Sequence, residues 1–160
     1  MTAADLLLAV MAIALAFLLA RGSHPAVACM LVASALAVSA LLFLPSGMLG
    51  DWVGMDHVQR LYALTRPTPL DPPEWIHVVA FAWLGLLIWL GRAGLRGWPG
   101  LLLITCLGVG AELAQWLADG RGASLGDAAL NVAGGVCGML LAIAARYLLK
   151  HRQARPPARE

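Results

Sequence analysis

The sequence predicts an all-α protein, a polytopic bundle of five transmembrane helices. Only 12% of its 160 residues are charged and 61% are hydrophobic, whereas soluble domains carry about 25% charged residues. The hydrophobic residues fall into long runs, and a helix needs about 20 of them, or roughly 17 to 25, to cross a bilayer. Five runs are predicted to meet that requirement: residues 3–20, 26–44, 75–91, 98–118 and 127–149.

The first run is predicted to be a retained span rather than a cleaved signal peptide. Residues 1–5 contain no Lys or Arg, and a signal peptide begins with a basic stretch. The hydrophobic run then continues to Ala20, which is longer than the apolar region of a usual signal peptide. We therefore count it as the first of the five crossings.

Residues near the ends of the later runs fit the ends of spanning helices. Trp75, Trp83 and Trp89 lie near or between the ends of the third run, and interfacial tryptophans make a short span tolerable. Pro99 stands where the fourth helix begins, a position at which a missing N–H costs least. Asp127 is predicted to cap the fifth helix, where its carboxylate faces free amides and the positive end of the helix dipole.

Lys and Arg are unevenly divided between the two sides of the predicted bundle. One side holds eight of the 11: Arg21, Arg92, Arg96, Arg146, Lys150, Arg152, Arg155 and Arg159. The other side holds Arg60, Arg66 and Arg121. Because cytoplasmic loops carry the excess of positive charge, the N-terminus is predicted outside and the C-terminus in the cytoplasm.

This layout divides the chain into two units and a tail. Residues 1–70 hold two spans and an external connection, residues 71–149 a three-helix unit, and residues 150–160 a basic cytoplasmic tail, expected to be disordered against anionic headgroups. Residues 66–73, with four prolines, are predicted to form an extended strap. Before the strap, helical spacing of hydrophobic residues predicts a short interfacial helix, through Trp52, Met55, Val58, Leu61 and Tyr62. The connection is either a lid over an external site or only a link between spans.

Composition argues against several kinds of site. A net charge of +2 gives no reason to expect nucleic-acid binding. The three cysteines, Cys29, Cys106 and Cys137, lie inside hydrophobic runs without the CxxC spacing of metal ligands. Gly108 to Gly110 is not a nucleotide loop, because no strand precedes it and no GxGxxG continues. No cofactor is predicted.

The few polar side chains of the last three spans are predicted to meet at one side of the membrane. Consecutive helices run in opposite directions, so the start of the third span, the end of the fourth and the start of the fifth share one side. The polar residues at these ends are His77, Glu112, Gln115, Arg121, Asp127 and Asn131. The i, i+3 spacing of Glu112 and Gln115, and the i, i+4 spacing of Asp127 and Asn131, place each pair on one helix face.

Small residues lie deeper along the same faces. Gly134 and Gly138 form a GxxxG pair, which lets a neighbouring backbone approach closely. Gly108 precedes Glu112 by four residues, and Gly85 lies on the face of the third helix that carries His77. The pattern predicts that the fourth and fifth helices pack tightly below a polar mouth, with a matching face on the third.

Glu112 is the most informative of these residues. A carboxylate near the middle of a membrane costs on the order of 2.5–3.5 kcal/mol on insertion scales, so it persists where it is paired or useful. Arg121, Gln115 and His77 are candidate partners. The alternative is a purely structural role, in which Glu112, Arg121 and Asp127 only hold the helices together.

The combined pattern His77-x3-Phe81, Glu112-x2-Gln115, Arg121 and Asp127-x3-Asn131-x2-Gly134 resembles the VanZ-like family of small bacterial integral membrane proteins. The likeness covers roughly residues 72–145. Family members often carry an Asp-Lys pair shortly before the histidine, where this chain has Pro73-Glu74-Trp75. The resemblance implies a place in the bacterial cytoplasmic (inner) membrane, a role in the cell envelope and a link to resistance to the glycopeptide teicoplanin. It does not assign chemical roles to the motif residues.

The favoured hypothesis is an envelope protein that binds a lipid-linked precursor or another anionic headgroup. Arg121 would meet a phosphate with its fork of donors, and Gln115 and Asn131 would hydrogen-bond the headgroup. The positive end of the fifth helix, near Asp127, also favours an anion.

Two other classes of function remain open. Glu112 and His77 can serve as general base and acid of a membrane-embedded enzyme acting on an envelope lipid, or exchange protons in a lipid flippase, which at this chain length would require a homodimer. A metal bound by His77, Glu112 and Asp127 is disfavoured because no HxxxH or HExxH spacing is present.

Overall fold

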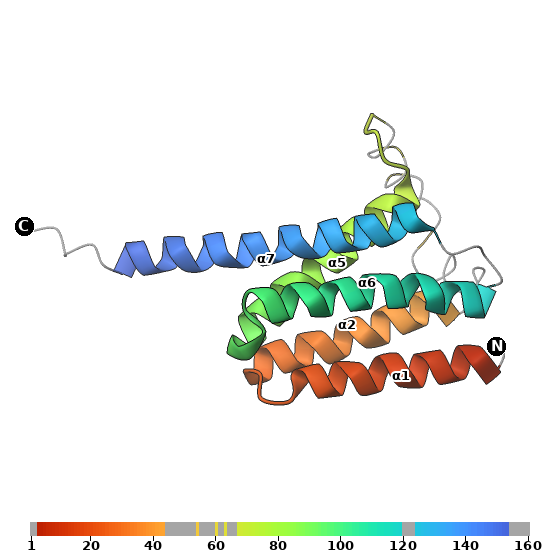
Figure 1. Cartoon of the computed structure of the whole chain (residues 1–160), viewed down its shortest axis with the longest axis horizontal. Coiled ribbons are helices and arrows are strands. Elements are labelled where there is room, and N and C mark those ends of the chain that lie inside the picture. Colours follow the sequence, from red (N-terminus) through yellow and green to blue (C-terminus); the bar gives the residue numbers. More distant parts are fainter. Residues whose placement is uncertain are drawn as a thin grey trace, which may run out of the picture.

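The described part of the chain is entirely helical apart from its connections. The computed structural model describes residues 3–43, 54, 60, 63, 67–119 and 124–153. Within them lie α1 (Ala3–Ala20), α2 (Pro25–Phe43), α5 (Pro72–Gly91), the short 3-10 helix η1 (Ala93–Leu95), α6 (Trp98–Asp119) and α7 (Leu125–Gln153). The predicted all-α class is confirmed, and each of the five predicted runs is a helix. Figure 1 shows them side by side as a bundle, with α7 projecting beyond the others toward the C-terminus.

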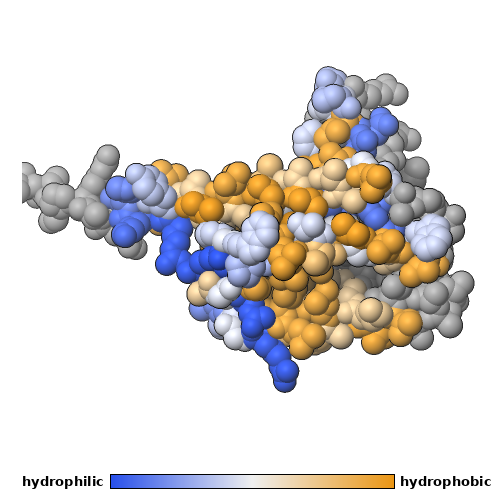
Figure 2. Space-filling view, in the orientation of Figure 1, coloured by the Kyte–Doolittle hydropathy of each residue, from blue (hydrophilic) through white to orange (hydrophobic). Residues whose placement is uncertain are grey.

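Two helices of the described part are long and apolar enough to cross a membrane. They are Glu74–Gly91 in α5 and Leu125–His151 in α7, and only 17% and 39% of their spanning windows are buried inside the protein. Figure 2 shows hydrophobic side chains over much of the visible face. These features are compatible with a membrane location. The apolar segments Ala9–Ala20, Pro25–Ala37 and Trp98–Ala114 are shorter, so five spans remain a prediction.

Glycines of α7 bring its backbone against that of α5. A Cβ on Gly134 would collide with the backbone of Val78, and one on Gly138 with the carbonyl of Ala82. The GxxxG pair therefore lies against α5, whereas the sequence pattern was interpreted as tight packing between the fourth and fifth helices. On the side facing α6, the absence of a side chain at Gly135 leaves room for the side chain of Ile104. The backbone contact with α5 and the side-chain contact with α6 fix the positions of the three helices relative to one another.

The remaining helices pack against α5 through two small hydrophobic clusters. One joins Leu19 of α1, Leu31 of α2 and Leu87 of α5. The other joins Ile88 of α5, Ile104 of α6 and Met139 of α7. The indole of Trp83 also donates a hydrogen bond to Ser34 Oγ at 2.9 Å, which links α5 to α2 along their lengths.

The start of α5 differs from the predicted extended strap. Residues 67–70 are turns and bends, but Pro72 and Pro73 already belong to the first turn of the helix, where proline is tolerated because the first N–H groups have no helical partner. Glu74 Oε2 accepts the backbone N–H of Asp71 at 2.7 Å, half of a capping box. Trp75 donates to Thr68 Oγ1 at 2.8 Å, so the preceding turn is held against the helix.

The two ends of α7 also differ from expectation. Ser124 precedes the first helical residue and its Oγ accepts the backbone N–H of Asp127 at 3.1 Å, so Ser124 rather than Asp127 is the N-cap. At the other end the helix continues through Lys150 to Gln153, which takes the first residues of the predicted tail into the helix. Of the predicted interfacial helix within residues 45–65 the structure describes only residues 54, 60 and 63, and the tail beyond residue 153 falls outside the described residues.

Candidate functional site

Four of the six predicted site residues lie together at one end of α5, α6 and α7. His77 lies in the second turn of α5, Glu112 near the end of α6, and Asp127 and Asn131 near the start of α7. His77 Nδ1 is 2.9 Å from Asn131 Oδ1 and 3.7 Å from Glu112 Oε1. The antiparallel arrangement of the helices thus produces the meeting point predicted from the sequence.

Asn131 is the centre of this cluster and is completely buried, with 0% of its surface exposed. Its Nδ2 group donates to Gly108 O at 3.2 Å and to Glu112 Oε1 at 3.3 Å. Its Oδ1 is an acceptor only, so His77 Nδ1 must carry the hydrogen between them. The amide therefore fixes the tautomer of the neutral imidazole and leaves Nε2 with its lone pair.

Glu112 is a buried carboxylate in the mainly apolar helix α6. It is 4% exposed, and beyond Asn131 its second oxygen lies 3.5 Å from the backbone N of Ser124. Gly108, one turn before it, leaves space for Asn131, because a Cβ there would come within 3.1 Å of the Asn131 Cβ. The carboxylate is buried and partnered, as a stable polar group inside a bundle must be.

Asp127 adds a second carboxylate beside the buried one. Because Ser124 caps the helix, the Asp127 side chain is released from the capping role predicted for it. One donor atom each from His77, Glu112 and Asp127 lies within 4.8 Å of the other two. The three groups are therefore close enough to be candidate ligands of one divalent cation, and oxygen and imidazole ligands suit such ions. This is the ligand set that the sequence pattern disfavoured.

The other two predicted residues cannot be placed in this geometry. Gln115 lies in α6, and its side chain is outside the described part of the chain, as is the whole of Arg121. Sequence reasoning missed two participants that the structure adds: the carbonyl of Gly108, and Ser124 as helix cap. The spacing Ser124-x-x-Asp127 before a hydrophobic run is a capping signature and was available as a signal; a backbone carbonyl carries none.

A comparison with known protein families, characterised proteins and solved structures found no match. The resemblance to the VanZ-like family therefore stays a prediction carried by the motif residues.

The described groups favour some ligands over others. Two neighbouring carboxylates repel a bare anion, since like charges a few ångströms apart in a low dielectric are strongly unfavourable. The same carboxylates and an imidazole attract a cation. The arrangement can therefore hold a divalent cation, or pass a proton between His77 and Glu112.

Proposed function

We propose that the chain is an integral membrane protein of the bacterial cell envelope that binds the phosphate-bearing headgroup of an envelope lipid at the polar end of α5, α6 and α7. The observation that carries the proposal is the cluster of buried Glu112 and Asn131 with partly buried His77 at the end of an otherwise apolar bundle. A buried ionisable group inside a spanning helix is a functional-site hypothesis by default.

Membrane placement is supported by the exposed surface of the helices. Large hydrophobic side chains are exposed on all three helices of the unit, including Val79 on α5, Leu113 on α6 and Leu140 on α7. Side chains of this size leave water readily, at roughly 25 cal/mol per Å² of apolar surface. The proposed topology keeps five spans in the cytoplasmic (inner) membrane, the N-terminus and the polar cluster outside, and the C-terminus in the cytoplasm.

The carboxylates decide how a phosphate is held. Glu112 and Asp127 repel a bare phosphate, so we place a divalent cation between them and the headgroup, held by both carboxylates and His77. Such a cation neutralises the site and bridges protein to phosphate oxygen. From the resemblance to the VanZ-like family we further propose that headgroup binding contributes to resistance to teicoplanin.

Replacing Asp127 with asparagine tests the proposal without disturbing the buried network. Asp127 contributes one of three ligands, and among the described residues no hydrogen bond to its carboxylate is seen. We expect Asp127→Asn to reduce both bound divalent metal and co-purified headgroup lipid by at least about tenfold, the effect of losing one charge-assisted contact. Metal analysis and native mass spectrometry of the purified protein measure the two losses.

Asp71→Asn is the matched control, because Asp71 is an exposed carboxylate just ahead of α5 and outside the cluster. It should leave both quantities unchanged, whereas chelation of the wild-type protein should remove metal and lipid together. Full lipid occupancy in Asp127→Asn and after chelation would contradict the proposal.

Catalysis by Glu112 and His77 is the second candidate function. It is favoured by the 3.7 Å separation of His77 Nδ1 and Glu112 Oε1, which lets the pair exchange a proton with a bound headgroup after a small movement. Recovery of a cleaved lipid from the wild-type protein, but an intact one from Glu112→Gln, would identify the enzyme.

A further inference from the structure

A second candidate site lies at the opposite end of the bundle. A cavity of about 300 Å³, wide open on one side, lies between the end of α5, Arg96 in the connection before α6, and the last third of α7. Its lining is Trp89, Arg96, Ile143, Arg146, Tyr147 and Lys150. Trp89 is 12 residues after His77 in one helix, so the cavity is roughly 18 Å along the helix axis from the polar cluster. The two features are therefore separate sites.

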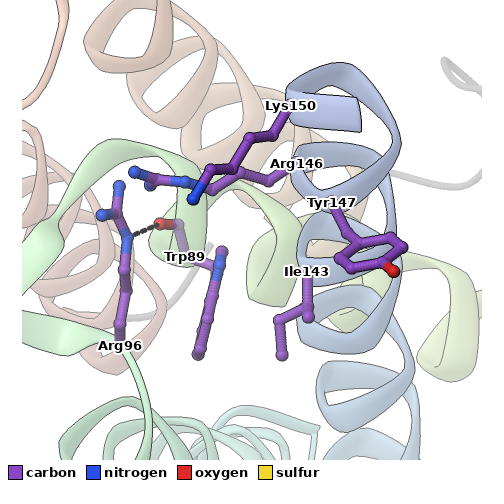
Figure 3. A pocket seen from close by; sticks show the side chains of 6 residues that line it. All are labelled: Trp89, Arg96, Ile143, Arg146, Tyr147 and Lys150. Atoms are coloured by element: carbon purple, nitrogen blue, oxygen red, sulfur yellow. Dashed lines mark hydrogen bonds between the residues drawn. The ribbon is translucent and has the colours of Figure 1, made fainter. Parts of the chain in front are cut away.

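The charge of the cavity has one sign. Three of its six lining residues are basic and none is acidic. Arg146 and Lys150 are one turn apart on α7, a like-charge spacing that is slightly unfavourable and that an anion between the two groups relieves. Figure 3 shows their charged ends, with that of Arg96, gathered on one side of the cavity beside the ring of Trp89. This arrangement favours an anion over a cation.

Trp89 provides a second, independent observation at the cavity. Its indole Nε1 is buried and is the one buried side-chain nitrogen or oxygen of the described residues that has no hydrogen-bond partner. A buried donor without an acceptor is unfavourable. Snorkelling of the basic side chains toward water explains the position of their charged ends, but it does not explain this unpaired N–H.

Arg96 is already oriented toward such a ligand. Its Nε donates to the backbone carbonyl of Trp89 at 3.2 Å, a contact drawn in Figure 3. This bond fixes the plane of the guanidinium and leaves its terminal N–H groups available, the fork that binds phosphate oxygens in pairs. Ile143 and the ring of Tyr147 supply an apolar wall on the α7 side.

We infer that this cavity binds the phosphate of an anionic membrane phospholipid. Arg96, Arg146 and Lys150 neutralise the phosphate, the Trp89 indole donates to one of its oxygens, and the lipid chains continue along the exposed hydrophobic face of α7. Basic pockets between helices on the cytoplasmic side are suited to anionic headgroups, and by the charge distribution this end faces the cytoplasm. The inference uses the proposed membrane placement but not the headgroup site at the other end.

Native mass spectrometry of the full-length protein in detergent tests the inference by titration with phosphatidylglycerol. We expect Arg146→Gln to weaken binding at least about tenfold, since it removes a charge-assisted contact, and Trp89→Phe to weaken it about three- to tenfold. Because the Trp89 ring also packs against the cluster of Ile88, Ile104 and Met139, Trp89→Phe should lower the thermal stability of the lipid-free protein slightly, so binding is compared on samples shown to be folded. Loss of stability with unchanged phosphatidylglycerol binding would identify a merely structural tryptophan.

Three controls test whether binding depends on this particular site, on the net charge of the lipid, and on a lipid phosphate rather than a free one. Arg21→Gln removes one exposed charge from the same end of the bundle and should bind as the wild type does. Phosphatidylcholine, whose ammonium cancels the phosphate charge, should bind at least about tenfold more weakly. Equal phosphatidylglycerol binding by the wild type, Arg146→Gln and Trp89→Phe would overturn the inference, and displacement of the lipid by inorganic phosphate would assign the cavity to a free anion instead.

Discussion

Replacement of Asn131 by aspartate is expected to lower the free energy of unfolding by about 3 kcal/mol or more. The change keeps the shape of the side chain but removes both donor hydrogens. Gly108 O and Glu112 Oε1, which accept those hydrogens at 3.2 and 3.3 Å, would then face a carboxylate oxygen. Because Asn131 is fully buried, no water can replace the lost donors. Thermal unfolding of the purified protein, followed by circular dichroism, measures the loss.

Asp127→Asn is the control for this prediction, four residues earlier on the same face of α7. It makes the reverse chemical change at a half-buried position, and we expect its unfolding free energy to stay within about 0.5 kcal/mol of the wild type. The pair thus separates a residue that holds the cluster together from one that serves a ligand. Equal stabilities of Asn131→Asp and the wild type would show that the amide does not organise the cluster.

The prediction of the helices and of the meeting point succeeded for physical reasons that a sequence carries directly. Long hydrophobic runs can satisfy their backbone only as helices in an apolar setting, so each predicted run is a helix. Antiparallel threading then requires the start of α5, the end of α6 and the start of α7 to coincide. His77, Glu112 and Asn131 are in contact because of that requirement.

Details that depend on the rotation of one helix against another were not predictable. Gly134 and Gly138 indicate that some backbone comes close, but nothing in their spacing indicates that it is α5 rather than α6. The cavity at Trp89 was missed for the same reason, since it requires α7 to stay helical through Lys150 and to present Arg146 toward Arg96. The roles assigned to Gln115 and Arg121 remain predictions, because these side chains are outside the described part.

Replacement of Gly138 by alanine is expected to destabilise the protein by about 2–3 kcal/mol, the upper range for overpacking. A Cβ at Gly138 would overlap the carbonyl of Ala82 in α5, and a backbone atom inside a helix cannot turn aside as a flexible side chain can. The two helices must therefore move apart. Since Gly134 meets Val78, the residue after His77, the same displacement draws His77 away from Asn131, and the headgroup site should weaken along with the fold.

Gly110→Ala is the matched control for this effect. Gly110 lies inside α6, and a Cβ there meets nothing within 4 Å, so the variant adds the same methyl group without a collision. Alanine is the better helix former by roughly 1 kcal/mol, and we expect Gly110→Ala to unfold at or slightly above the temperature of the wild type. Scanning calorimetry of both variants in the same detergent decides the matter. If the two alanines shift the unfolding temperature equally, close backbone packing between α5 and α7 does not position the site.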